Sequence, residues 1–373
     1  MPLTLTEDQT LLRDSARGFF ADKTPVSHLR KLRDTNDADG FSRDAWQESA
    51  SMGFPGLLIA ESEGGSGLGF AEAAIVMEEI GRNLTPSPLL ATGIVAATAL
   101  KAAGGAKAKA LLAQIAAGEK LVALCIDEHG KHAPAKIALT AKRAGNGFTL
   151  DGSKTFVVDG HVADVLIVAA KTDGGGITLF LVDPKAKGVS IERTAMVDAH
   201  NAARIAFDGV AVDADAVLGE VDGGAKVLEA ALDAGRVAVA AELLGVADEA
   251  FAQTVAYLKE RKQFGKAIGE FQALQHRAAH LFSELEITRA AVTKAAQTLD
   301  ATPDKASAVI AMAKARACST GDLAVREAVQ MHGGMGMTDA LDVGLFMKRA
   351  RVLQELFGDA NFHVDRLAAM RGY

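Results

Sequence analysis

The hydrophobic period of the chain changes twice along its length, and these changes limit the folds that it can adopt. Apolar residues recur at helical spacing up to about residue 118, for example in "TEDQTLLRDSARGFFADK", and again from about residue 223. Between about 119 and 222 apolar and polar residues alternate, as in "KIALTAKRAGNGFTLDGSKTFVVDG". We therefore predict an α+β, mostly helical fold with a helical domain over 1–118, an antiparallel β-domain over 119–222 and a helical bundle over 223–373.

Local signals support this division. Thr6 precedes two acidic residues and a helical pattern, which predicts a helix N-cap, and the prolines of "TPSP" predict the end of the helix in "FAEAAIVMEEIGRNL". "AGNG" predicts a hairpin turn, and the glycines of "KTDGGGITL" join two further strands. These connections are too short for βαβ crossovers. The "GGSG" segment lacks the strand and lysine of a phosphate-binding loop, so we interpret it as a tight turn.

Composition excludes several classes of protein. The 373 residues carry a net charge of -7, without a basic block, which argues against nucleic-acid binding. No apolar run reaches the roughly 18 residues that a membrane span needs, and the N-terminus has no apolar signal core. The two cysteines, Cys125 and Cys318, have no metal-ligand or disulfide-framework spacing. We expect a soluble cytoplasmic protein.

The histidines do not predict a metal site. His129 and His132 lie in a polar segment, "DEHGKHAP", without further ligands at fixed spacing. We expect His276 and His332 to be packed or hydrogen-bonded within the helical bundle, and we predict no bound metal.

Two C-terminal motifs carry a family resemblance. "YLKERKQFGKAIGEFQALQ" (257–275) and "AVQMHGGMGMT" (328–338) occur together, and "MEEIGRNLTPSP" and "FPGLLIAESEGGSGLG" are weaker companions. With these motifs the chain resembles FAD-dependent acyl-CoA dehydrogenases over nearly its whole length. The resemblance implies an N-terminal helical domain, a middle β-domain and a C-terminal four-helix bundle. It also implies dehydrogenation of an acyl-CoA substrate, with electron-transfer flavoprotein as the electron acceptor.

The resemblance also assigns residues to the FAD site. Arg261 would reach the pyrophosphate of FAD bound in the neighbouring subunit of a dimer, since its planar guanidinium suits phosphate oxygens. Phe264 would pack against the adenosine, and glycines would let backbone N–H groups approach the phosphates. The predicted cofactor-binding residues are Arg261, Gln263, Phe264, Gln272, Gln330, Gly333 and Gly334.

The catalytic positions depart from the family pattern. The family's general base is a Glu in an E-G-T segment, but "ARVLQELFGDA" places Phe357 there, with Gly358 keeping the register and Asp359 replacing the Thr. Some members carry the base just before a helical Arg instead, and that position is Gly235, followed by Arg236. We therefore predict no catalytic residue at either position.

The β-domain departs as well. The strand expected to contact the flavin ring reads "KTFVVDG", with Phe156 in place of a Trp and Val158 in place of a hydroxyl residue. Cys125 and Asp127 fall near the expected Thr and Pro of a loop that would bind flavin and thioester, and no matching serine follows.

Three hypotheses follow from this pattern. The first is a base-less subunit of a heterotetrameric acyl-CoA dehydrogenase, which completes the FAD site of a homologous catalytic subunit; such enzymes are known in bacterial degradation of steroid side chains or other bulky acyl chains. The second is a homo-oligomeric dehydrogenase with a displaced base, Asp359 or Glu355, whose ordinary roles would be a turn or cap residue and an exposed helical carboxylate. The third is a flavin-free scaffold or acyl-CoA-binding module.

Overall fold

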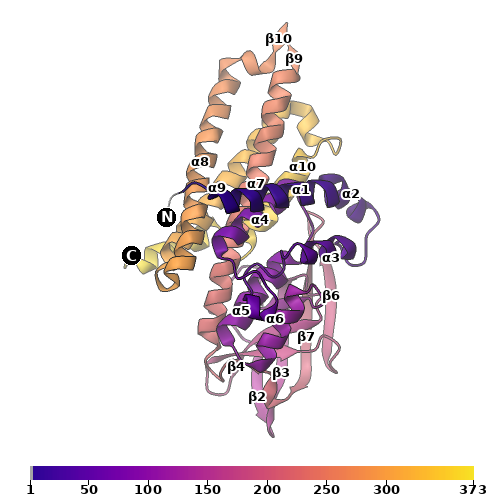
Figure 1. The fold of residues 1–373 in the computed structure, drawn as a ribbon, viewed down its shortest axis with the longest axis vertical. Helices are drawn as coiled ribbons and strands as arrows, with labels where there is room; N and C mark the ends of the chain where they lie inside the picture. The colour runs from indigo at the N-terminus through magenta and orange to yellow at the C-terminus, as the bar shows by residue number, and fades with distance from the viewer. Residues whose placement is uncertain (1–2) are drawn as a thin grey trace. The chain divides into compact units, whose positions relative to one another are not determined.

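The computed structural model describes residues 3–373, which form a mostly helical chain with one large sheet (Figure 1). The chain divides into two compact units. Unit 1 contains the chain up to Lys31 together with Phe70–Thr85 and Arg236–Tyr373, and unit 2 contains Leu32–Gly69 and Pro86–Gly235. Each unit combines segments that are far apart in the sequence. The three consecutive domains predicted above therefore remain a prediction, whereas the α+β, mostly helical fold class is confirmed.

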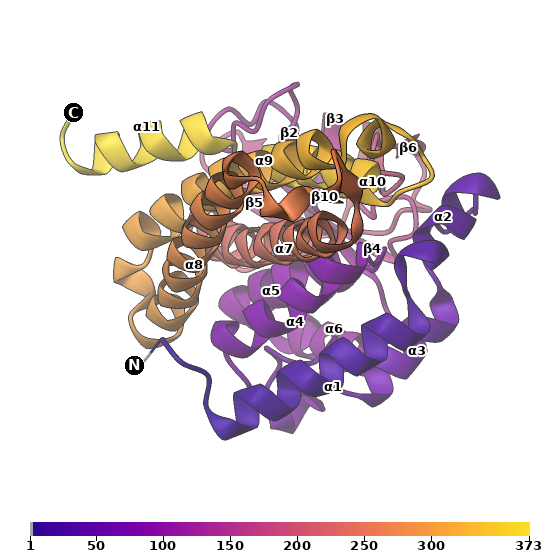
Figure 2. The ribbon, with the colours of Figure 1, turned by 90° about the horizontal axis from the view of Figure 1, so that it is seen from above.

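Unit 1 is built from helices. Its bundle is formed by α7, which begins in unit 2, with α8, α9 and α10, and α11 packs on α9. In Figure 2 α1 and α11 lie on opposite sides of α7. The helices are α1 (Glu7–Lys23), α2 (Val26–Asp34, which continues into unit 2), α4 (Phe70–Asn83), α7 (Gly224–Glu260), α8 (Gln272–Ala301), α9 (Ser307–His332), α10 (Val343–Glu355) and α11 (Ala360–Met370).

The first helix begins as its sequence predicts. Thr6 accepts a hydrogen bond from the backbone N–H of Gln9, and the Gln9 side chain accepts one from the backbone N–H of Thr6. This reciprocal pair satisfies two N–H groups that the first helical turn would otherwise leave without partners. Gln9 also donates to Glu72 of α4 at 2.7 Å, which ties the start of α1 to the neighbouring helix.

Two glycines allow α4 and α7 to cross at close range. A Cβ atom on Gly81 would overlap the backbone oxygen of Glu242, and one on Gly245 would overlap the backbone oxygen of Glu78. The absence of a side chain therefore lets the two helix backbones touch. An ion pair supports this crossing, since Arg82 on α4 binds Asp248 on α7 at 2.6 Å.

Unit 2 contains short helices and the sheet. The helical segments are α3 (Arg43–Ser51), a π-helical segment η2 (Leu89–Ala96), α5 (Ala97–Ala103) and α6 (Ala106–Ala116). The strands are β1 (Val122–Cys125), β2 (Thr140–Ala144), β3 (Gly147–Val158), β4 (Val165–Thr172), β5 (Ile177–Val182), β6 (Val189–Ala195), β7 (Asn201–Val212) and β8 (Val217–Leu218).

The strands pair in the order β6-β7-β3-β2-β4-β5-β8, and β1 pairs with β4. The predicted hairpin at "AGNG" joins β2 to β3, and the glycine turn joins β4 to β5. All pairings are antiparallel except those of β4 with β1 and β2. These two are parallel because a long connection separates β1 from β4 and the β2–β3 hairpin turns the chain back between them. Inward residues such as Leu150, Val168 and Phe180 form the core of this sheet.

The predicted turn at "GGSG" is present. Gly64 follows the short 3-10 helix η1 (Glu61–Glu63) in the left-handed region, with φ of 82°. A Cβ atom on Gly65 would overlap the backbone oxygen of Ile59, so the segment folds tightly on its own chain.

Candidate functional site

The predicted FAD-binding residues meet at one end of the helical bundle. A hairpin of β9 (Lys262–Gln263) and β10 (Lys266–Ala267) connects α7 to α8, and the 3-10 helix η6 (Gly333–Met337) follows α9. The rings of Tyr257, near the end of α7, and His332, at the end of α9, stack at 4.4 Å between centroids. Residues 261–272 and 330–334 are thereby brought to the same end of unit 1 (Figure 1).

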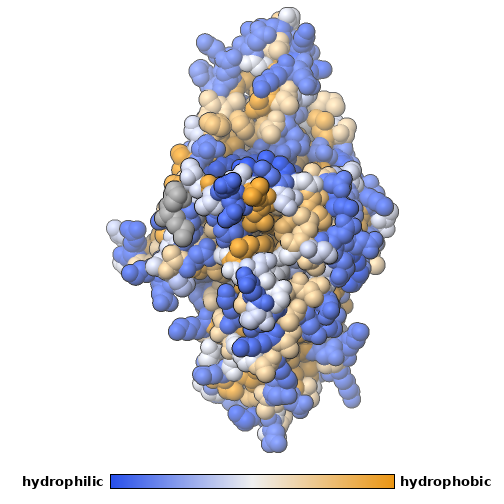
Figure 3. All heavy atoms as spheres, in the orientation of Figure 1, coloured by the Kyte–Doolittle hydropathy of each residue, from blue (hydrophilic) through white to orange (hydrophobic). Residues whose placement is uncertain are grey.

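The hairpin presents one cation and one aromatic ring to solvent. Among residues 3–373, no carboxylate or carbonyl accepts a hydrogen bond from the exposed Arg261 side chain, so its five N–H donors remain available. Phe264 is 92% exposed and has a left-handed backbone, with φ of 53°. Figure 3 shows a mainly hydrophilic surface over the projecting hairpin, so this exposed ring is an exception there.

The other predicted residues of this end are also accessible. Gln263, Gln272 and Gln330 are exposed, and Gln263 donates to the neighbouring backbone oxygen of Lys262 at 2.7 Å. Gly333 has φ of 61°, and a Cβ atom on Gly334 would meet nothing within 4 Å. Available guanidinium donors, an exposed ring and a glycine backbone fit the phosphates and adenosine of a dinucleotide. The assignment of each residue to FAD stays a prediction.

The expected position of the base has a different structure. Phe357 is buried and has φ of 56°, and Gly358 follows with φ of 105°. The carbonyl of Phe357 accepts a hydrogen bond from His363 Nε2 at 3.1 Å. A Cβ atom on Gly358 would overlap the ring of Phe362, so this residue must be glycine for the ring to lie against the turn.

A buried lysine holds this turn. Lys314 Nζ donates to the carbonyl oxygens of Leu353 at 3.1 Å and Gly358 at 3.0 Å, and it lies 3.2 Å from Cys318 Sγ. Burial lowers the pKa of the Lys314 ammonium. The cation lies at the C-terminal end of α10, where it interacts favourably with the helix dipole. Lys314 thus fixes the backbone at the place where a catalytic carboxylate would be expected.

Both candidate displaced bases have structural roles. Asp359 accepts a hydrogen bond from the backbone N–H of Phe362 at 2.9 Å and caps α11. Glu355 lies 2.6 Å from Arg351, one helical turn earlier on α10. Capping by Asp359 matches the ordinary role expected for that residue from its sequence context.

The surroundings of the turn are positively charged. Arg236 is buried, and its guanidinium carbon lies 6.0 Å from the centroid of the Phe362 ring. Burial, with the nearby charges of Lys314 and Arg236, lowers the pKa of His363 to about 3. His363 is therefore a neutral hydrogen-bond donor near neutral pH. No proton acceptor is provided at Gly235, the alternative base position.

In unit 2 the loop after β1 closes on itself. The carboxylate of Asp127 binds His132 Nδ1 at 2.9 Å and accepts the backbone N–H of Ala133 at 3.2 Å. Phe156 has φ of 56°, within a register irregularity between β3 and β7. Burial raises the pKa of the Cys125 thiol to about 12, so this thiol is protonated and inert.

Sequence reasoning missed a buried ion pair beneath this loop. Lys154 on β3 donates to Glu128 Oε1 at 2.7 Å and to the carbonyl of Ile126 at 3.1 Å. Burial raises the pKa of Glu128, but hydrogen bonds from Lys154 and from two backbone N–H groups outweigh it, so that the pKa is lowered. Lys154 shares the inward parity of Phe148 and Leu150, and a lysine at such a position signals a buried acidic partner.

The histidine expectations are confirmed in part. His332 is buried and its Nδ1 lies 2.8 Å from the backbone oxygen of Ala328. His276 was expected to be packed or hydrogen-bonded. This is wrong, because His276 is exposed near the start of α8 and makes no hydrogen bond with its side chain among residues 3–373. Within the described part of the chain, no three His, Cys, Asp or Glu side chains gather as a metal site requires. No helix among residues 3–373 combines the length and apolar content needed to cross a membrane.

Comparisons with known proteins cover the whole chain. Three family models match in order: "Acyl-CoA dehydrogenase, N-terminal domain" over residues 6–119, the middle domain over 124–210 and the C-terminal domain over 222–370. A long-chain specific acyl-CoA dehydrogenase from Sus scrofa mitochondria is 30% identical over 98% of this chain and 86% of its own length.

Two similar solved structures have names that join two proteins. The Tcur3481-Tcur3483 steroid ACAD is 32% identical, with a TM-score of 0.90 and 99% of each chain covered. The ChsE4-ChsE5 complex from Mycobacterium tuberculosis is 26% identical, with a TM-score of 0.91, covering 100% of this chain and 99% of that one.

Proposed function

Since the chain belongs to the acyl-CoA dehydrogenase family of FAD-dependent oxidoreductases, we propose that it is the base-less subunit of a heterotetrameric acyl-CoA dehydrogenase. Its partner is a homologous subunit that carries the catalytic Glu. The observation that carries the proposal is the buried Phe357 at the position of the base, held by Lys314 and His363. A phenyl ring cannot accept the α-proton of a thioester.

The neighbouring carboxylates do not supply a substitute. Asp359 is committed to capping α11, and Glu355 is paired with Arg351. Either residue would have to leave its partner to act as a base, and Asp359 would then leave an N–H group at the start of α11 without its cap. These contacts favour the base-less subunit over the dehydrogenase with a displaced base.

The residues that match the family's FAD-binding motifs support a role in the FAD site of a partner subunit. Arg261 would hold the FAD pyrophosphate with its available donors, and Phe264 would pack on the adenosine. Bound FAD supplies the acceptor for the hydride that leaves the β-carbon of the acyl-CoA. This chain would bind and orient the nucleotide tail, while the partner positions the thioester and removes the proton. A flavin-free scaffold would not need these residues, which we call the nucleotide clamp (Arg261 and Phe264).

The names of similar solved structures support the proposed assembly and substrate class. One is named the ChsE4-ChsE5 complex, and the name of the other joins Tcur3481 with Tcur3483 and calls the protein a steroid ACAD. We therefore place this chain in the degradation of a steroid side chain or another fatty acyl chain, with electron-transfer flavoprotein as the electron acceptor. The proposed compartment is the reducing cytoplasm, in keeping with buried thiols at Cys125 and Cys318.

The proposal is tested by expressing the chain alone and together with a homologous subunit that has the E-G-T segment. We expect the chain alone to purify with little flavin and without activity. The pair should form a heterotetramer with one FAD for each unlike pair and should dehydrogenate an acyl-CoA thioester. Mass by light scattering, flavin absorbance and dye reduction give the three readouts. A fully flavinated, active homomer would contradict the proposal.

A further inference from the structure

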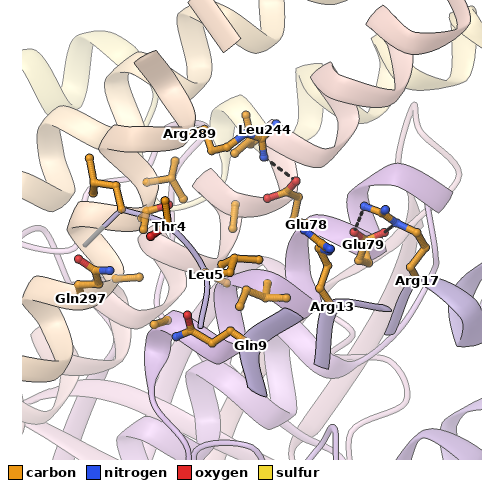
Figure 4. A pocket seen from close by; sticks show the side chains of 18 of the residues that line it. Thr4, Leu5, Gln9, Arg13, Arg17, Glu78, Glu79, Leu244, Arg289 and Gln297 are labelled. Carbon is orange, nitrogen blue, oxygen red and sulfur yellow. Dashed lines mark hydrogen bonds and ion pairs between the residues drawn. The ribbon is translucent and has the colours of Figure 1, made fainter. Parts of the chain in front are cut away.

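A cavity of about 270 Å³ lies within unit 1, away from the predicted FAD-binding residues. It is enclosed by the segment before α1 and by α1, α4, α7 and α8 (Figure 4). None of the predicted FAD-binding residues lines it. Because all its walls belong to one compact unit, the cavity is a feature of that unit by itself.

Much of the wall is apolar and made of small residues. Ala71 and Ile75 contribute from α4, Ala241 and Leu244 from α7, and Ala296 from α8. Leu5 lies over the cavity from the segment before α1, as Figure 4 shows. The alanines leave space between the helices, and the apolar wall favours an aliphatic group inside.

The inner polar end of the cavity is already neutralised. Arg289 on α8 binds Glu78 on α4 at 2.8 Å, and Arg82 lies 3.3 Å from the same carboxylate. Glu79, which is fully buried, accepts two hydrogen bonds from Arg17, at 2.7 and 3.1 Å. Each carboxylate therefore has an arginine, and a cation entering the cavity would find no unpaired acidic group.

The outer polar end retains hydrogen-bond donors. Arg13 and Arg17 lie on successive turns of α1, with side chains 35% and 49% exposed. Each uses Nε and Nη2, Arg13 for Asp14 and Arg17 for Glu79. Among residues 3–373 no acceptor engages the Nη1 group of either arginine. Four arginines and two glutamates line the cavity, and two further carboxylates lie against these arginines: Asp14 beside Arg13, and Asp248 beside Arg82 and Arg289. The Nη1 groups of Arg13 and Arg17, and not a net charge, are therefore what the cavity offers to an anion.

We propose that this cavity binds a short aliphatic carboxylate at a site separate from the flavin site. The carboxylate lies against Arg13 and Arg17, where charge-assisted hydrogen bonds are available. The chain extends between the alanines of α4, α7 and α8. A volume of 270 Å³ lies just below the range of about 300–1,000 Å³ typical of ligand pockets, which restricts the site to small molecules.

Octanoate is the probe that tests the proposal, with 1-octanol and octylamine as its uncharged and cationic counterparts. Isothermal titration of the full chain should show saturable binding of octanoate and much weaker binding of the other two. Arg13→Gln should weaken octanoate binding about tenfold, since a charge-assisted hydrogen bond is lost. Arg326→Gln removes a more exposed arginine on α9 that does not line the cavity, and it should leave binding unchanged.

A second pair of variants tests the apolar wall. Ala296→Leu fills the cavity from a buried position and should abolish binding. Ala71→Leu fills it from a partly exposed position, where the added side chain is less prone to disturb folding, and should also abolish binding. Thermal unfolding reports whether each variant is folded. Absence of octanoate binding to the parent chain, or unchanged affinity in folded Ala71→Leu, overturns the proposal because binding then lies elsewhere.

Discussion

At the residue scale, the turn at Phe357 and Gly358 is held through its backbone and carries a phenyl ring where the family resemblance predicts a carboxylate. Lys314 and His363 bond to the two carbonyls of the turn, and Phe362 covers Gly358. The sequence predicted the loss of the base from the register that Gly358 provides. It did not reveal Lys314 or His363, because their partners are backbone oxygens that carry no sequence signal.

Restoring a carboxylate at this position should not restore activity. Phe357→Glu places a negative charge near the buried cations Lys314 and Arg236, so we expect a folded protein within about 1 kcal/mol of the parent. The chain alone should still fail to dehydrogenate an acyl-CoA, because Phe156, Val158 and Asp127 remain unchanged. Thermal unfolding and dye reduction check both parts. Phe357→Gln is the uncharged control, and turnover by Phe357→Glu alone would contradict the expectation.

His363 should make stability dependent on pH. Its pKa is about 3 in the folded chain against an ordinary value of 6.5. Below pH 6.5 the His363 side chain of the unfolded chain therefore binds a proton, whereas that of the folded chain stays neutral. The stability that depends on neutral His363 is fully present above pH 6.5 and is lost as the pH falls towards 3. The loss between pH 6.5 and 5 should be about 2 kcal/mol.

Denaturant unfolding across this range measures the slope of stability against pH. His363→Gln keeps an N–H donor for Phe357 and should flatten the slope, whereas His276→Gln, at an exposed position, should not. An equal slope in all three proteins would show that another group is responsible.

At the scale of elements, local patterns predicted most helices and strands. The Thr6 cap, the "AGNG" hairpin and the proline-terminated α4 are confirmed because each depends on residues close in sequence. The parallel pairing of β1 with β4 could not be predicted, since it joins strands separated by a long connection. The close α4–α7 crossing could not be predicted either, because the sequence does not show that Gly81 faces α7 and that Gly245 faces α4.

Gly245→Ala tests that crossing. Alanine favours helix formation, but its Cβ would overlap the Glu78 backbone oxygen, so we expect a net loss of about 2 kcal/mol in unfolding free energy. Gly18→Ala is the matched control, because a Cβ there meets nothing within 4 Å. That variant should gain up to about 1 kcal/mol. Denaturant titration measures both, and stabilisation by Gly245→Ala would refute close packing at this crossing.

At the scale of the whole molecule, the proposed function assigns FAD binding and proton removal to two different chains. The residues predicted to bind FAD lie at one end of the bundle, whereas Phe357, Phe156 and Val158 occupy the positions at which the family resemblance predicts a base and flavin-ring contacts. Both sets stay predictions, which rest on motifs that can be recognised in the sequence alone. It could not predict the cavity lined by Arg13 and Arg17, whose walls come from four helices distant in sequence.

Arg261→Gln tests the clamp in the assembled enzyme. Losing a charge-assisted hydrogen bond to phosphate should weaken FAD binding by the heterotetramer at least tenfold. Turnover per bound FAD should stay near that of the parent, because the proposed function assigns proton transfer to the partner subunit. Flavin titration and dye reduction measure the two quantities. Arg326→Gln serves as the control, and unchanged FAD affinity in Arg261→Gln would remove Arg261 from the clamp.

The exposed Phe264 ring has a consequence for the protein in the cell. A phenylalanine that is 92% exposed on a projecting hairpin adds apolar surface that an unassembled chain leaves in contact with water. An orphan copy should therefore be removed faster than an assembled one. We expect the abundance of this polypeptide to follow the abundance of the partner chain that covers the hairpin. Copies made in excess of that partner should be degraded.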